Sequence, residues 1–407
     1  MRREMKRLLL LLLCVLPTPA FAQIDYGASG YIDLRLVSAA DETSWLQGGL
    51  GKTRYGNGDS DFQFAGAVGQ GYVLLTPEIL AVTVLRIEPE QRTFVDILES
   101  YVRYRPVSTS PWRGSVKGGA FFAPFSLENT ELGWSSYWTI TPSAINSWFG
   151  EELRTIGAEG TLDWRTPEGT LEFIAAGLGW NDPAGVMVAD RGWTLDDRPT
   201  GLIDYLRLPN ATLILFGQQP PDSTPIFAEY DGNAGWYAGL AWDDASRWHL
   251  EVEHYDNQAD PAAHDGDYFA WRTRFWNAGA SWKFDEITLL SQALTGDTTI
   301  APFTGFTSTT DFQSAYLLAG WERDEWRVAI RGDWFRTSTH TTFGPSPPLS
   351  ENGGALTGAV SWLPRDWVRL TGEVLWVDSR RDGRAVSGLD PRQNNVQLQL
   401  SARFYLE

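Results

Sequence analysis

The side chains that most often carry out chemistry are few in this chain and do not form catalytic patterns. The histidines are His249, His254, His264 and His340, and the one cysteine is Cys14. His249 and His254 are five residues apart, so on a strand they face opposite sides and cannot share a metal ion. No Gly-rich phosphate loop, His-Glu-x-x-His or Gly-x-Ser-x-Gly motif is present. We therefore predict no enzymatic activity, no cofactor and no bound metal.

Two other kinds of chemistry stay open at this point. A Ser–His hydrolase assembles its triad from residues far apart in sequence, so residue spacing does not exclude one. The pairs Asn181–Asp182 and Asp265–Asp267 offer hard oxygen atoms of the kind that Ca²⁺ prefers. Neither pair matches a complete calcium-binding loop.

Charged residues form a more extended pattern. Segment 123–151 carries Glu128, Glu131 and Glu151 and contains no Lys or Arg. Basic residues occupy polar positions of alternating segments elsewhere: Arg35, Arg103, Arg105, Lys117, Arg327, Arg331, Arg369 and Arg403. If the acidic segment and the basic residues line a water-filled passage, they set up a transverse field in which small polar solutes align. The alternative is that each basic residue is a solvated side chain balanced by a nearby acid such as Asp33, Glu99, Glu159 or Asp333.

Strands are the elements that must position these charges. In 395–406 all six even positions are apolar, and five of the six odd positions are polar. The same alternation recurs at 368–376, 327–334, 248–253 and 31–36. A strand directs successive side chains to opposite faces, so these segments have one apolar and one polar face. Twelve residues are also enough for a tilted strand to cross a bilayer, for which about 9–11 suffice.

Tryptophan at the turns distinguishes a membrane barrel from a soluble β-sandwich, because the strands of both folds alternate apolar and polar residues. Short charged turns at 242–248 (WDDASRW), 321–326 (WERDEW) and 362–367 (WLPRDW) have Trp on both shoulders, and Trp164 and Trp282 precede two more. Indole rings favour the membrane–water boundary. Longer polar segments alternate with these turns, as expected for the two ends of an outer-membrane barrel.

The sequence therefore predicts an all-β, transmembrane, antiparallel up-and-down β-barrel of sixteen strands. Their expected cores are 28–38, 60–75, 79–88, 93–105, 112–122, 152–164, 170–180, 235–242, 247–256, 268–284, 287–296, 311–321, 327–336, 354–362, 367–377 and 394–406. An alternative of eighteen strands adds a hairpin of 202–208 and 211–217. We also expect a β-bulge at Phe275–Trp276, where the apolar parity changes.

The first residues predict export. A basic start, an apolar run at 8–16 and Ala20-Phe21-Ala22 have the order of a cleaved secretory signal peptide. We predict a signal peptide at 1–22 and a barrel domain at 23–407. A formal net charge of −18 disfavours nucleic acid as a partner.

A resemblance supports this interpretation. Residues 118–128 (GGAFFAPFSLE), which close one expected strand and open the long loop, resemble the matching stretch of the phosphate-selective porin family. The chain from residue 23 onward also resembles Gram-negative sixteen-strand porins. This resemblance implies a third external loop that narrows the channel, with Glu128 and Glu131 at the narrowing, and a trimer. It does not imply phosphate as the solute, because the chain lacks a dense lysine cluster. The chain also ends in Tyr405-Leu406-Glu407 rather than in the terminal Phe common in barrel proteins.

Our first hypothesis is a bacterial outer-membrane porin for passive diffusion of small hydrophilic solutes or ions. Its expected partners are outer-membrane lipid, lipopolysaccharide, the solutes and two further copies of the chain. A substrate-specific channel for a sugar or an organic acid, with Tyr31, Tyr101 and Tyr255 as guiding aromatics, is the alternative. An outer-membrane hydrolase is the third hypothesis.

Overall fold

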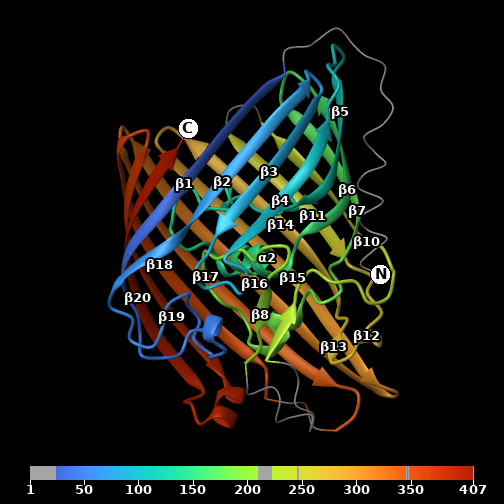
Figure 1. The fold of residues 1–407 in the computed structure, drawn as a ribbon, viewed down its shortest axis with the longest axis vertical. Coiled ribbons are helices and arrows are strands. Elements are labelled where there is room, and N and C mark those ends of the chain that lie inside the picture. The colour runs from blue at the N-terminus through green and yellow to red at the C-terminus, as the bar shows by residue number, and fades with distance from the viewer. Residues whose placement is uncertain (1–23, 210–221, 245–246, 345, 347, 407) are drawn as a thin grey trace.

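In a computed structural model, which describes residues 24–209, 222–244, 247–344, 346 and 348–406, sixteen antiparallel strands form a closed barrel (Figure 1). Each strand pairs with its neighbour in the chain, and β1 pairs with β20 to close the ring. The predicted strand number is confirmed. The barrel strands are β1 (Asp25–Ser38), β2 (Phe62–Thr76), β3 (Ile79–Ile87), β4 (Val95–Tyr104), β5 (Trp112–Phe121), β6 (Thr155–Arg165), β7 (Thr170–Gly179), β10 (Gly235–Asp243), β11 (Trp248–Asp256), β14 (Arg272–Phe284), β15 (Ile287–Phe303), β16 (Phe306–Arg323), β17 (Trp326–Thr341), β18 (Glu351–Arg365), β19 (Val368–Arg381) and β20 (Arg392–Leu406).

The alternation of side chains has the predicted physical cause. On β20, Leu398 and Leu400 lie on the outside and are 45% and 62% exposed, whereas Gln397 and Gln399 point inward and are buried. An exposed apolar exterior is stable only where hydrocarbon replaces water. The polar residues are buried because loops fill much of the interior.

Tryptophans form a belt at the end of the barrel that carries the short turns. Trp164, Trp248, Trp282, Trp326 and Trp362 are all exposed on the outside. Two cross-strand pairs stack, Trp112 with Trp164 and Trp326 with Trp362, with ring centroids 5.8 and 5.9 Å apart. The apolar exterior, the belt and the closed ring are the features of a bacterial outer-membrane barrel.

The alternative of eighteen strands and the expected β-bulge are both wrong. Segment 202–208 does not enter the barrel, because β7 pairs directly with β10. Its residues form β8 (Tyr205–Arg207), which pairs with β9 (Ser223–Pro225) in a separate two-stranded sheet. Leu206 and Leu208 pack against other loop side chains instead of lipid. The expected partner, 211–217, lies outside the described residues.

The predicted bulge at Phe275–Trp276 is also absent. Both residues pair in an unbroken register with β11 and β15. Trp276 faces outward and is 56% exposed, whereas Phe275 faces inward and is 1% exposed. Adjacent aromatics therefore reflect two apolar environments, lipid outside and a packed loop inside, rather than a change of parity.

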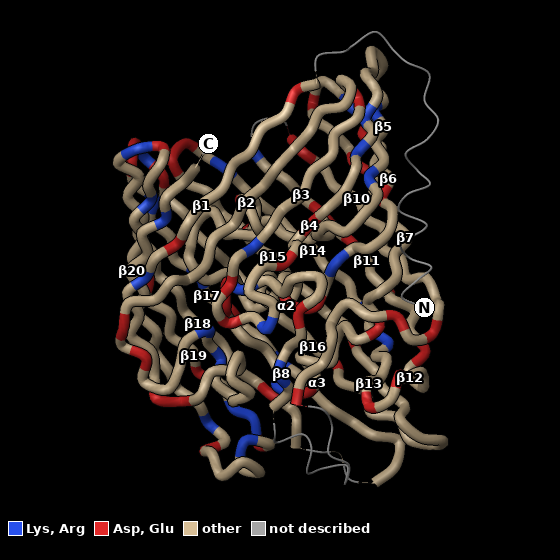
Figure 2. Tube along the Cα trace, viewed as in Figure 1, with Lys and Arg blue, Asp and Glu red and all other residues tan. Residues whose placement is uncertain are grey.

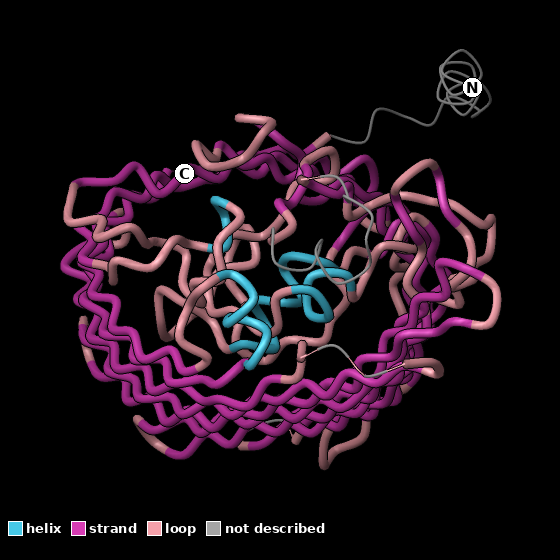
Figure 3. The backbone as a smooth tube through the Cα atoms, turned by 90° about the horizontal axis from the view of Figure 1, so that it is seen from below, coloured by secondary structure: helices cyan, strands magenta, loops and turns pink. Residues whose placement is uncertain are grey.

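Three loops from the end opposite the short turns enter the barrel. Loop 1 is residues 39–61 and contains a 3₁₀ turn, Trp45–Gln47. Loop 3 is 122–154 and contains α2 (Ala144–Glu152), and loop 4 is 180–234 and contains α3 (Val186–Asp190). A view along the barrel shows the helices inside the ring of strands (Figure 3). The end that carries these loops is the external one, because short turns belong to the periplasmic side.

The other loops are less extensive. A small hairpin, β12 (His264–Asp265) with β13 (Tyr268–Phe269), lies between β11 and β14, and a 3₁₀ segment, Asp382–Ser387, precedes β20. None of the helices in the described ranges has the length and apolarity to cross a bilayer. The predicted signal peptide, 1–22, lies outside the described residues.

Candidate pore constriction

Loop 3 is ordered by its own sequence before it meets the wall. The Ser143 side chain accepts a hydrogen bond from the Asn146 backbone N–H and so caps the first turn of α2. All nine residues of α2 are buried. A short helix buried on every side is stabilised by tertiary contacts rather than by its intrinsic propensity. The position of loop 3 therefore depends on what surrounds it.

Aromatic side chains fix loop 3 against one side of the inner wall. Phe125 contacts Tyr237 and Phe275 with ring centroids 5.0 and 5.7 Å apart, and Trp148 lies 5.1 Å from Phe312. These loop residues belong to one buried cluster with inward-facing residues of β7, β10, β11 and β14 to β19. Each large side chain so buried contributes about 1.5–3 kcal/mol.

Glu128 is ion-paired directly with the wall. Its Oε1 lies 2.5 Å from Arg331 Nη1, and both side chains are fully buried. Its Oε2 accepts hydrogen bonds from the Ser143 backbone N–H and the Asn146 amide. Arg331 also pairs with Asp333 at 2.8 Å. The expected open gap between the loop acid and this wall base is therefore absent, because the desolvated charges are in contact.

Glu131 lies among three wall arginines and is partly exposed. Its carboxylate oxygens are 2.9 Å from Arg369 Nη1, 3.6 Å from Arg327 Nη1 and 3.9 Å from Arg403 Nη1. Tyr31 stacks beneath Arg403, with the guanidinium 4.1 Å from the ring centroid. Arg327 also pairs with Glu322, and Arg403 also pairs with Asp33, so the three arginines that line this part of the lumen lie among three acids.

The third predicted loop acid, Glu151, does not reach the wall. It pairs with Arg191 of loop 4 and accepts a hydrogen bond from Thr194. Its neighbour Glu152 accepts hydrogen bonds from the Gly185 and Val188 backbone N–H groups. Burial raises the pKa of Glu152 to about 7, even though Arg191 and the hydrogen bonds from the Gly185 backbone and the Trp148 indole oppose the shift. Loops 3 and 4 are thus joined through two adjacent carboxylates.

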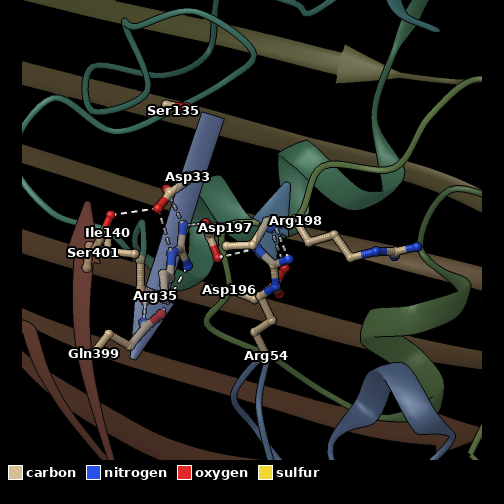
Figure 4. A network of polar contacts seen from close by, with 12 residues as sticks. Asp33, Arg35, Arg54, Ser135, Ile140, Asp196, Asp197, Arg198, Gln399 and Ser401 are labelled. Atoms are coloured by element: carbon tan, nitrogen blue, oxygen red, sulfur yellow. Dashed lines mark hydrogen bonds and ion pairs between the residues drawn. The ribbon is translucent and has the colours of Figure 1, made fainter. Parts of the chain in front are cut away.

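Arg35 belongs to a separate network that includes loop 4 (Figure 4). It pairs with Asp33 on its own strand at 2.8 Å and with Asp197 of loop 4 at 2.5 Å. Arg54 of loop 1 contacts the same Asp197 at 3.2 Å. Although burial alone would raise the pKa of Asp197, the two guanidiniums hold it below its ordinary value. The charge pattern of the sequence did not identify Arg54 or Asp197 as members of this network.

The remaining predicted bases lie toward the short-turn end. Lys117 on β5 pairs with Glu159 on β6 at 2.9 Å. Arg103 is the cross-strand neighbour of Lys117, and Arg105 follows the last residue of β4. Within the described ranges, neither arginine forms an ion pair. In the middle of the barrel, Figure 2 shows charges of both signs around α2.

An acidic surface that the sequence interpretation overlooked lies on the opposite wall. Asp163 and Glu172 are cross-strand partners on β6 and β7, and His249 on β11 contacts Asp243 and Glu251 at 3.2 and 3.1 Å. All but Glu251 line a cavity of about 570 Å³, which Asp244, Arg247 and Lys283 also line. In the ring of sixteen, β7 is the seventh strand and β19, which carries Arg369, the fifteenth, so the two surfaces face each other. These acids occupy polar positions of their strands, so the alternation of apolar and polar residues in the sequence could have identified them as lumen-facing.

One group of acids in loop 4 has the spacing of a metal site. Carboxylate oxygens of Asp182, Glu229 and Asp231 lie within 4.8 Å of one another. Each also accepts a backbone hydrogen bond, from Tyr230 to Asp182, for example. Of the two calcium-type pairs in the sequence, only the one containing Asp182 contributes to this group. The carboxylates stabilise a loop turn, which is a sufficient role for them.

Comparisons with known proteins agree with this fold. No protein-family model matches the chain, and no curated protein matches its sequence. The outer-membrane channel DcaP of Acinetobacter baumannii is similar in structure, with a TM-score of 0.58 and 10% identity over 96% of this chain and 100% of that one. An anion-selective porin of Comamonas acidovorans gives 0.52 and 10%, covering 94% and 100%. The trimer form of OmpT, an outer-membrane protein of Vibrio cholerae, gives 0.51 and 7%, covering 94% and 99%. The chain is therefore a bacterial outer-membrane β-barrel with the sixteen-strand fold of the porins.

Proposed function

We propose that this protein is a channel for passive diffusion of small hydrophilic solutes or ions, narrowed by loop 3. The observation that carries the proposal is the ion pair between Glu128 and Arg331, which holds loop 3 across the interior of a barrel too wide for wall side chains to fill. The solute gradient drives transport, and the channel needs no cofactor.

The polar walls define which solutes pass. The arginine-lined surface around Glu131 and the carboxylate-rich surface around Glu172 face each other, so charged groups line both walls of the lumen. Solutes that carry a dipole or a charge interact with both surfaces, whereas apolar solutes must displace ordered water without compensation. A cavity of about 430 Å³ between loop 3 and the strands β1, β2 and β4, lined by Gln70, Glu99 and Glu131, is the open space beside loop 3.

Planar-bilayer recordings of the refolded full-length mature barrel test the proposal. We expect stepwise conductance from the wild-type protein. Reversal potentials of Glu128→Gln and Glu131→Gln then separate the roles of the two acids, since Glu131 is partly exposed to the lumen and Glu128 is not. We expect Glu131→Gln to shift the reversal potential toward anion preference. A folded, heat-modifiable barrel that never conducts would refute the channel.

A substrate-specific channel is the second candidate. The observation that favours it is the pair of aromatic rings near the arginines around Glu131, where Tyr31 and Tyr405 pack edge to face with ring centroids 6.2 Å apart. Of the three aromatics expected to guide a solute, Tyr31 and Tyr255 are buried, and Tyr101 is half-buried. Saturable uptake of one sugar or one organic acid in liposomes would favour this candidate, and flux linear in concentration would favour simple diffusion.

We also propose a homotrimer in lipid and lipopolysaccharide. The trimer form of the structurally similar Vibrio cholerae protein supports this stoichiometry. Light scattering of the detergent complex gives the protein mass, and a mass of one chain would contradict the proposal.

A further inference from the structure

Asp197 of loop 4 lies between two guanidinium groups that belong to other parts of the chain (Figure 4). Arg35 Nη2, from β1, is 2.5 Å from Asp197 Oδ2, and Arg54 Nη1, from loop 1, is 3.2 Å from Oδ1. Each carboxylate oxygen therefore has its own charged donor. Two donors that converge on the two oxygens of one planar carboxylate match the geometry by which proteins recognise carboxylate ligands.

Both arginines are held in place without Asp197. Arg35 donates hydrogen bonds to Asp33 at 2.8 Å and to Gln399 at 3.0 Å. Arg54 donates to Glu88 at 2.8 Å, to Glu90 at 2.9 Å and to the Ala65 carbonyl at 2.7 Å. The guanidiniums would keep their directions if the Asp197 carboxylate left. Such preorganisation lowers the ordering cost of binding a ligand.

Loop 4 is also anchored independently of the Asp197 side chain. Backbone N–H groups of Leu195 and Thr200 donate to the carbonyls of Lys52 and Gly150 at 2.8 and 3.0 Å. The Asp196 backbone N–H donates to Ser147 Oγ at 3.0 Å. The Asp197 side chain is 11% exposed, whereas those of Arg35 and Arg54 are each 1% exposed. The open side of the contact is therefore the side on which Asp197 sits.

The charge count around this contact leaves one place for an anion. The ion pairs connected to this contact contain six bases, Arg35, Arg54, Arg86, Arg327, Arg369 and Arg403. Besides Asp197 they contain five acids, Asp33, Glu88, Glu90, Glu131 and Glu322. Five acids against six bases leave one positive charge in excess, and Asp197 neutralises it. A buried excess charge is costly unless an anion pairs with it.

We propose that Arg35 and Arg54 form a subsite for the carboxylate group of a small organic anion, and that Asp197 occupies this subsite as an internal competitor. The inference rests on the proposed channel function, because the ligand reaches the subsite through the lumen. An organic carboxylate displaces the Asp197 side chain and pairs with the same two guanidiniums. A neutral solute of equal shape gains nothing there.

Calorimetric titration of the full-length mature barrel in detergent tests the subsite, with benzoate as the ligand and benzamide as its neutral counterpart. Asp197→Ala removes the competitor, and Asp222→Ala, an exposed acid of the same loop, is the matched control. We expect Asp197→Ala to bind benzoate about tenfold more tightly than either wild type or the control, since one charge-assisted contact no longer competes. Benzamide affinity should not change. Equal benzoate affinity in Asp197→Ala and Asp222→Ala would overturn the proposal.

Two further measurements keep the test decisive. Adding Arg35→Gln to Asp197→Ala should abolish the gain in benzoate affinity, and retention of the gain would place the ligand elsewhere. In the wild-type protein, which needs no variant to fold, benzoate but not benzamide should shift the ¹³C resonance of the Asp197 carboxylate, because displacement separates it from the two guanidiniums while the backbone anchors of loop 4 stay in place. An unchanged Asp197 resonance in saturating benzoate would also contradict displacement of Asp197.

Conductance separates this inference from the channel proposal. If the barrel binds benzoate as expected but never conducts, the subsite proposal stands and the channel proposal fails. If the barrel conducts but the two alanine variants bind benzoate equally, the channel proposal stands and the subsite proposal fails.

Discussion

Replacing Glu128 by alanine tests whether loop 3 is held inside the barrel by the contacts described above. The change removes the 2.5 Å ion pair to Arg331 and the acceptor of the Ser143 backbone N–H, which lies 2.8 Å away. Removing one partner of a buried ion pair costs about 3–5 kcal/mol. Arg331 keeps its second partner, Asp333, at 2.8 Å, so the lower end applies. We expect loop 3 docking to weaken by about 3 kcal/mol, which is roughly 150-fold in the docking equilibrium.

Hydrogen exchange measured by mass spectrometry reads that equilibrium locally. Amides of 139–152 should exchange roughly 150-fold faster in Glu128→Ala, while strand amides keep their protection. Glu128→Gln should show a smaller effect, because the amide oxygen still accepts a hydrogen bond from Ser143. Glu168→Ala, in an exposed periplasmic turn, is the control. Unchanged exchange at 139–152 in a folded Glu128→Ala barrel would refute the assignment of the buried pair as the anchor of loop 3.

Three further outcomes follow from the structure. Because burial raises the pKa of Glu152 from 4.5 to about 7, the docked loops hold a proton that undocked loops release, so docking weakens as pH rises through that window. Exchange at 185–190, corrected for its intrinsic pH dependence, should rise between pH 4.5 and 7. Glu152→Gln should reduce this rise and leave the part due to Asp190, whose pKa burial also raises to about 7. Leu400→Arg places a charge on the lipid face of β20 and should cost about 2–4 kcal/mol in urea unfolding from lipid vesicles, whereas Leu406→Arg, at the end of that strand, should cost about 0–1 kcal/mol. Arg403→Gln should move the reversal potential toward cation preference and Glu172→Gln toward anion preference; shifts of the same sign would contradict two opposed charged walls.

The barrel could be predicted from sequence because its exterior imposes a local rule. Lipid on one side and polar surroundings on the other force a period of two on each strand, and Trp and charged residues mark the turns. The rule gave a wrong prediction where the inward face of a strand is also apolar. Phe275 and Trp276 looked like a bulge because periodicity does not distinguish an aromatic facing lipid from one facing loop 3.

The interior of the barrel was harder to predict, because its contacts join residues far apart in the chain. Arg331 pairs with Glu128 across 203 residues, and Arg35 contacts Asp197 across 162. The sequence identified Glu128 and Arg331 as opposite charges in a loop and a wall. It did not indicate that they touch, that Glu151 pairs within the loops, or that loop 4 enters the lumen. Such pairings depend on how three loops share one space.

The arrangement of the inner wall also indicates where water can pass. From β10 to β17 the wall presents Tyr237, Phe275 and Phe312 to loop 3, and these rings are buried together. Apolar rings in contact leave no hydrogen-bonding partners for water, so solute does not pass between loop 3 and that wall. The other face of loop 3 meets Gln70 and Glu99 across the cavity of about 430 Å³. Loop 3 also packs against β1 to β4, through Phe122, Leu132 and Trp134. In the proposed channel, the space open to hydrophilic solutes beside loop 3 is therefore this cavity, between the apolar contacts on its two sides.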